Sequence, residues 1–320
     1  MNMNIKENLI VILSLTLAAC NQKPVVNEMY VSNDTIYLDS TYFAEMPIEE
    51  KKQRFIDTGN PVYFYFIPWM SGEQLFIYNI INANKYGDHH SEYMYYEMFK
   101  LYFHNMDSYL NFDLLDTISR KQVTEKLLDA AEAGVPFANL DLYEYYKKGI
   151  GMDKDEQMAD IVLKRVDTKR KKVFKPENVY EYLGKQLVIR NTLPNKKKPI
   201  NEQKLAYFCC PEFGDKKLFK NICEQGDTNS YKIAKAFFRK EGVEREVIFF
   251  SIVMANKYNN ARACYDVYYC LWMAFNGGKD AEQWDMTRFD PKSREFALFY
   301  LKRGASLGNK VCEDILLKQF

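Results

Sequence analysis

The chain lacks the features that identify the common catalytic classes. It has only three histidines, His89, His90 and His104, and no Cys-x-x-Cys pair. It also contains no Gly-x-Ser-x-Gly turn, no His-Glu-x-x-His pair and no glycine-rich loop of the kind that holds phosphate. Catalysis is therefore poorly supported, and we expect no catalytic residue, metal or cofactor.

A strong net charge is missing as well. The 44 Lys and Arg residues nearly balance the 43 Asp and Glu residues, for a net charge of +1. No global field draws such a chain to nucleic acid, and we expect no nucleic-acid partner. Hydrophobic residues make up 47% of the chain and aromatic residues 15%, which indicates a folded protein with a full core.

No apolar run reaches the length of roughly 20 residues that a membrane-spanning helix needs. The longest, Leu9–Ala19, follows a short polar start and ends in Leu-Ala-Ala-Cys at Cys20. This resembles a bacterial lipobox, in which the cysteine becomes the lipidated first residue. We expect a lipoprotein signal peptide at 1–19 and a tether at 20–28; an ordinary signal peptide is the alternative. Asn21 after the anchor favours the outer membrane, facing the periplasm.

A short spaced pattern recurs five times along the rest of the chain. Each copy starts at a small residue and includes the residues four, eight and twelve positions later. The side chains at these positions mostly become larger along the copy. The copies start at Gly87, Gly134, Gly226, Asn259 and Gly308. Residues four apart lie on one face of a helix. Five such copies predict an array of repeated helical units.

The central copy is the most complete and defines the unit as a helical hairpin. Glycines at both ends of the first helix suit a reversing chain, and Asp155 stands where the second helix would be capped. The repeat-defining residues are Gly87, Gly134, Ala138, Leu142, Tyr146, Gly149, Gly151, Gly226 and Gly308.

These residues resemble the Sel-one-like repeat family, a tetratricopeptide-like family. The match is fullest in 120–165 and 290–320 and partial in 71–105 and 215–275. It departs where Tyr143 replaces a glycine and Val162 a tryptophan. The resemblance implies an all-α fold, an α-solenoid of helix–turn–helix repeats that binds other proteins.

The segment 29–70 differs from the array that follows it. Tyr30-Val31 and Thr35–Leu38 look extended, and Val62–Ile67 is a β-prone aromatic run between prolines. We expect a small irregular or β-containing N-terminal cap at 29–70 and the repeat array at 71–320. The expected early helices are Gln74–Asn84, His90–Phe103, Asn111–Ala131, Ala138–Lys148 and Asp155–Val166.

A basic insertion interrupts the repeat spacing at about 167–205. Its middle, Glu177–Val188, is compatible with a helix. Insertions in repeat arrays often lie on the binding face, so its cations are a candidate interface; a solvated loop is the alternative. The candidate interface residues are Lys169, Arg170, Lys171, Lys172, Lys196, Lys197 and Lys198.

Six cysteines remain besides the proposed anchor Cys20, and all lie in the C-terminal part. An even number in an exported chain favours disulfides, with 15 possible pairings. The alternative is that some are core residues, since Cys312 occupies a small-residue position of its repeat. The candidate disulfide cysteines are Cys209, Cys210, Cys223, Cys264, Cys270 and Cys312.

Three functions fit these expectations. The family resemblance implies, first, a lipid-anchored protein-binding array, most specifically an immunity protein that neutralises a secreted, lipase-type toxic effector. The second is an envelope scaffold or signalling adaptor. The third is a hydrolase that uses Asp88, His89 and His90.

Overall fold

The structure is a computed structural model that describes residues 29–31, 35–39, 46–60, 63, 71–106, 109–166, 186–190, 216–277 and 282–319. The described residues belong to two compact units. One contains the strands, from within 1–46 and 175–196, and the other contains the helices, from within 47–174 and 197–320.

The strand unit is a three-stranded sheet. Strands β1 (Met29–Val31) and β2 (Thr35–Asp39) pair antiparallel, with Tyr30 opposite Tyr37. Strand β3 (Gln186–Arg190) pairs parallel with β2, with Tyr37 opposite Val188. The extended pieces expected near the N-terminus are therefore strands, and one of them, β2, pairs with a strand from the middle of the expected basic insertion.

Two local expectations are corrected here. The segment Glu177–Val188 was compatible with a helix, but its last residues begin β3 at Gln186. The β-branched Val188 and Ile189 suit a strand that pairs with β2. In the β-prone run Val62–Ile67, the structure describes Tyr63 only, and Tyr63 is helical.

The second unit consists of helices. They are α3 (Ile48–Thr58), α5 (Gly72–Tyr86), α6 (His89–Tyr102), α7 (Thr117–Glu132), α8 (Pro136–Lys148), α9 (Glu156–Arg165), α12 (Lys216–Lys220), α13 (Thr228–Lys240), α14 (Ile248–Lys257), α15 (Ala261–Asn276), α16 (Pro291–Ser306) and α17 (Lys310–Leu317). Shorter helical turns are η1 (Phe112–Leu114), the π-helical η4 (Asn221–Gln225) and η5 (Glu244–Val247). No described helix is long and apolar enough to cross a membrane.

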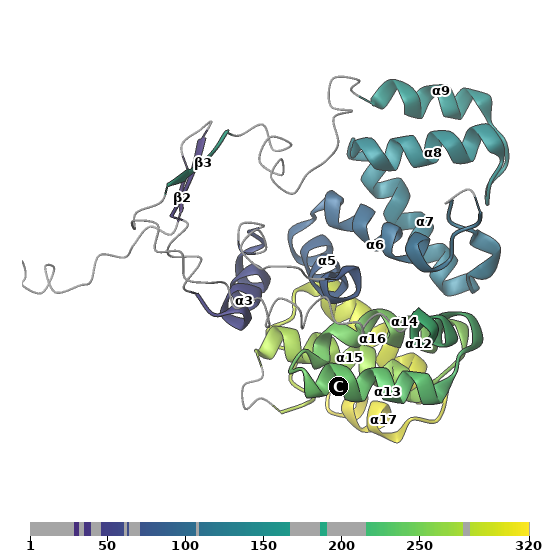
Figure 1. Cartoon of the computed structure of the whole chain (residues 1–320). Coiled ribbons are helices and arrows are strands. Elements are labelled where there is room, and N and C mark those ends of the chain that lie inside the picture. Colours follow the sequence, from purple (N-terminus) through teal and green to yellow (C-terminus); the bar gives the residue numbers. More distant parts are fainter. Residues whose placement is uncertain are drawn as a thin grey trace, which may run out of the picture. The chain divides into compact units, whose positions relative to one another are not determined.

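Successive helices pack against each other as hairpins, and this confirms the expected array of helical repeats (Figure 1). All five residues that start a repeat copy have positive φ, between 51° and 87°. This left-handed conformation ends one helix and turns the chain into the next. Asn259 is the one described non-glycine residue with positive φ, and asparagine tolerates that conformation better than most residues.

The position four residues into each copy lies where two helices come close. The residues there are all at most 5% exposed: Ser91, Ala138, Ser230, Ala263 and Cys312. Small side chains at this place let neighbouring helices approach. In the central copy, however, the buried tyrosine is Tyr145, whereas Tyr146 is only half-buried.

One expected helix is divided. Asn111–Ala131 contains η1 and then α7, which starts at Thr117. The division follows from Asp116, whose side chain accepts hydrogen bonds from the backbone N–H groups of Ile118 and Ser119. A capping aspartate that satisfies these otherwise unpaired donors fixes the start of a helix.

Helix α14 joins the two ends of the array. All residues from Ile248 to Asn256 are buried, so the helix contacts other elements on every side. The ring of Phe249 lies 5.2 Å from that of Phe76 in α5 and 5.4 Å from that of Phe99 in α6, both edge to face. The first hairpin therefore packs on a helix about 150 residues later in the chain.

A buried charge cluster ties α3 to α5 and η5. Glu246 is fully buried; its Oε1 accepts hydrogen bonds from Lys52 Nζ at 2.5 Å and Tyr78 OH at 3.1 Å. Arg245 Nε donates to Tyr78 OH at 3.0 Å, and its other end pairs with Glu49 at 2.8 Å. Burial raises the pKa of Glu246, while Lys52 opposes this shift. Each buried charge depends on its partner.

The repeat-start glycines give a first prediction. A Cβ at Gly226 would lie 2.3 Å from the ring of Tyr258, whereas a Cβ at Gly87 meets nothing within 4 Å. Gly87→Ala should lower the unfolding free energy by only about 1–2 kcal/mol, because alanine disfavours the left-handed conformation. Gly226→Ala should cost clearly more, because Tyr258 must also move. Equal costs in urea unfolding would contradict this account of the repeat start.

The charge cluster gives a second prediction. Lys52→Met removes the nearest cation from buried Glu246 and should lower the unfolding free energy by about 3–5 kcal/mol. The double variant Lys52→Met/Glu246→Met should recover much of that loss. The matched control is Lys121→Met in α7, whose pair with Glu125 is exposed at the surface; it should cost less than about 1 kcal/mol. Similar losses for Lys52→Met and Lys121→Met would refute the role given to the cluster.

Candidate functional site

Several residues singled out from the sequence lie outside the described residues. They are the proposed lipidation site Cys20 and the candidate interface residues Lys169–Lys172 and Lys196–Lys198. Three clusters of polar side chains lie within the described part of the chain.

The Asp88, His89 and His90 cluster is used for structure. Asp88 caps α6: its Oδ2 accepts from the Ser91 backbone N–H at 2.8 Å and from Asn82 Nδ2 at 3.0 Å. His89 Nδ1 pairs at 2.7 Å with Glu92, not with Asp88. Burial lowers the pKa of His90. Within the described ranges, no three His, Cys, Asp or Glu residues come together as a metal site.

A second polar cluster lies between α6 and α8. Lys100 Nζ is 3.1 Å from both carboxylate oxygens of Asp141, and Tyr93 OH donates to Asp141 at 3.0 Å and to Glu97 at 2.8 Å. The hydroxyls of Tyr96 and Tyr145 are hydrogen-bonded to each other. Cation and carboxylates satisfy one another here, so the cluster holds two helices together and offers little to a ligand.

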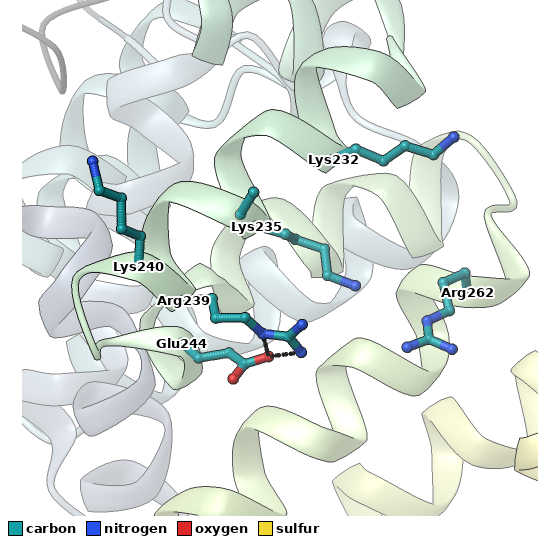
Figure 2. A pocket seen from close by; sticks show the side chains of 7 residues that line it. Lys232, Lys235, Arg239, Lys240, Glu244 and Arg262 are labelled. Carbon is teal, nitrogen blue, oxygen red and sulfur yellow. Dashed lines mark hydrogen bonds and ion pairs between the residues drawn. The ribbon is translucent and has the colours of Figure 1, made fainter.

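The third candidate is a basic pocket of about 400 Å³ between α13 and the start of α15. Five of its seven lining residues are cationic, and one is acidic. Figure 2 shows Lys235 and the Arg239–Glu244 pair near the centre of this region, with the side chains of Lys232 and Lys240 extending outward on opposite sides. The lining residues are Lys232, Lys235, Ala236, Arg239, Lys240, Glu244 and Arg262. We call this set the basic pocket.

Helix α13 presents its cations because its other face is buried. Ser230, Ala234 and Phe238 recur every four residues and are at most 5% exposed. The helix starts at Asp227, whose carboxylate accepts from the backbone N–H of Ser230 at 2.9 Å. These hydrogen bonds lower the pKa of Asp227. The opposite face is left to Lys232, Lys235 and Arg239, at i, i+3 and i+7.

The floor of the basic pocket is built on Asp266, a carboxylate only 3% exposed. It accepts from Lys235 Nζ at 2.5 Å and from the buried hydroxyl of Tyr231 at 2.9 Å, and it pairs with Arg262 Nε at 3.4 Å. One carboxylate thus holds two pocket cations in place. Their charges together exceed that of Asp266, so the floor keeps a positive charge.

The rim of the basic pocket contains cations without a counter-charge. Arg239 pairs with Glu244 at 2.7 Å, and this carboxylate raises the pKa of Arg239. Lys232 and Lys240 are exposed, and neither has an ion pair with any described residue. The helix rise places these two lysines about 12 Å apart along α13. The rim can therefore accept negative charge at two points.

An aromatic stack fixes one side of the basic pocket. The guanidinium of Arg262 lies 4.6 Å from the ring centroid of Tyr265. The rings of Tyr265 and Tyr269 stack at 5.8 Å, as do those of Tyr269 and Trp272. Tyr269 is half-buried, and its pKa is raised by burial and then by Glu244. An arginine held on an aromatic face is oriented before any ligand arrives.

Sequence reasoning missed the basic pocket because it looked for runs of lysine. Lys232, Lys235 and Arg239 of α13 are spaced by three and four residues, so they look dispersed in the sequence but share one helix face. Their helical spacing was a readable signal. Arg262 could not have been added, because its approach to α13 depends on how the repeats pack.

The described cysteines are free thiols, which corrects the disulfide prediction for them. Cys223, Cys264, Cys270 and Cys312 are each buried and form no disulfide in the structure; Cys209 and Cys210 lie outside the described residues. A Cβ on Gly304 would lie 2.6 Å from Cys312 Sγ and 3.0 Å from Cys264 Cβ. These thiols are small residues in close helix contacts. Burial raises the pKa of Cys264 to about 11 and that of Cys312 to about 12.

Comparison with known proteins gives a structural neighbour of this chain. No family model and no curated protein matches the chain. A structure search finds a Sel1 repeat protein from Oxalobacter formigenes at 14% sequence identity. The alignment covers 95% of this chain and 99% of the other, with a TM-score of 0.27. At that TM-score the two chains do not superpose as wholes. The array of helical repeats therefore rests on the dihedral angles and contacts given above.

The burial of the thiols gives a third prediction. In the native chain, maleimide should label none of the four described cysteines, because the thiolate is the reactive form and burial disfavours it. Denaturant without reductant should expose all four to labelling, as read by peptide mass spectrometry. Recovery of a disulfide-linked peptide that contains two of them would contradict their assignment as core residues.

Proposed function

We propose that this chain is a protein-binding repeat protein, and most specifically an exported immunity protein that neutralises a secreted, lipase-type effector. The observation that carries the proposal is the basic pocket on a helical-repeat array. Paired helices offer long side-chain faces to other proteins. The pocket gives one such face five cations, and two of them, Lys232 and Lys240, have no ion pair with a described residue.

Two further observations support a binding role over a catalytic one. The groups of the Asp88 cluster serve as a helix cap and a local ion pair. The described cysteines have raised pKa values, which makes them poor nucleophiles. Neither set is arranged like a nucleophile with its base.

The immunity role adds the proposed lipid anchor at Cys20. An anchor in the bacterial envelope, on the outer membrane and facing the periplasm, would hold an inhibitor where an incoming effector arrives. The repeats resemble the Sel-one-like family, which includes lipoproteins with this role. Such a protein needs one tight and specific partner, whereas an envelope scaffold would bind several partners more weakly.

The fourth prediction tests this proposal. The mature chain without lipid, purified and immobilised, should capture one dominant protein from its own cells in near-equal amount. That protein should be a hydrolase acting on lipids, and a stoichiometric amount of the chain should abolish its activity. Several envelope proteins in smaller amounts would favour the scaffold instead. If the immobilised chain repeatedly captured no protein, whether or not the cells were producing the effector, both binding roles would be contradicted.

A further inference from the structure

We propose that the basic pocket receives an acidic segment of the protein partner, with carboxylate side chains pairing to Lys232, Lys240 and the floor cations. This inference rests on the proposed binding function and specifies the chemistry of the surface that is bound. The occupant to which we commit is a run of Asp or Glu residues on a protein.

Charge complementarity is the first argument. Five cationic residues line one hollow, opposed by Glu244 in the lining and by Asp266, which pairs with Lys235 and Arg262. The chain as a whole is almost neutral, so this concentration is local. Lys232 and Lys240 have no counter-charge among the described residues, and a partner carboxylate would supply one. Complementary charge of this kind selects partners and speeds their association.

Preorganisation is the second argument. Arg262 is held by the Tyr265 ring and by Asp266, and Lys235 is held by the same carboxylate. Side chains that are already ordered lose less conformational entropy when a ligand binds. Asp266 is itself fixed by the buried hydroxyl of Tyr231. The basic pocket therefore has paired cations on its floor and exposed lysines without an ion-pair partner among the described residues at its rim.

The spacing of the rim lysines defines a suitable probe. Lys232 and Lys240 are eight residues apart on α13, which corresponds to about 12 Å along the helix. An extended peptide rises about 3.3 Å per residue, so carboxylates at positions 1, 3 and 5 span about 13 Å on one side. A fluorescent peptide with the core Glu-Ser-Glu-Ser-Glu matches this separation. The same peptide with Gln for Glu is its uncharged control.

The fifth prediction is a titration of the full chain with these two peptides by fluorescence anisotropy. The Glu peptide should bind and the Gln peptide should not, and binding should weaken as salt is raised. Lys232→Glu/Lys240→Glu should weaken binding of the Glu peptide about tenfold or more, since repulsion replaces attraction at both rim positions. Glu244→Gln should instead strengthen it severalfold, because it removes the only acidic lining side chain and releases Arg239.

The matched control is Lys292→Glu/Lys302→Glu, which makes the same charge change at exposed lysines of α16. It should change the affinity less than twofold. Equal weakening by both double variants, or no binding of the Glu peptide, would overturn the proposal. Preferential, rim-dependent binding to phosphatidylglycerol vesicles would also overturn it and assign the basic pocket to a membrane. The titration uses only the chain and a synthetic peptide. A failed titration would therefore contradict the acidic-segment proposal alone, whereas a failed capture would contradict the proposed function.

Discussion

Glu246 is the point on which the arrangement of the helical unit depends. Its carboxylate is fully buried and is hydrogen-bonded to Lys52 and Tyr78, which come from helices more than 160 residues earlier. An unpaired buried charge is very costly, so the cluster allows α3, α5 and η5 to meet in only one way. The ring of Phe249 packs against Phe76 and Phe99 and adds apolar contacts between these distant parts of the chain. The array therefore has contacts between its two ends as well as between neighbouring repeats.

That junction also determines the shape of the basic pocket. Glu244, Arg245 and Glu246 are consecutive residues of η5. The last two point into the buried cluster, and Glu244 lies in the pocket lining, where it orients Arg239. On the other side, Asp266 in α15 orders Lys235 and Arg262. Three of the five pocket cations, Lys235, Arg239 and Arg262, are thus positioned by carboxylates of the helical unit.

Sequence pattern alone predicted the local repeat well, because the hairpin depends on short-range rules. A residue with positive φ, a small residue one turn later and a large one two turns after that are all readable along the chain. It could not predict contacts that join distant repeats, such as Lys52 with Glu246 or Arg262 with the face of α13. The even number of cysteines in a chain expected to be exported favoured disulfides, whereas the structure explains Cys312 by its close packing against Gly304. Strand β3 was missed because its partner lies about 150 residues away.

The most direct measurement of the central claim is lysine footprinting of the chain with and without its captured partner. Acetylation of free lysines, read by peptide mass spectrometry, reports which amines the partner covers. The account predicts that Lys232 and Lys240 react readily in the free chain and become protected in the complex, while Lys292 and Lys302 stay reactive. Protection elsewhere, with Lys232 and Lys240 unchanged, would show that the partner binds another face and that the basic pocket is not the binding site.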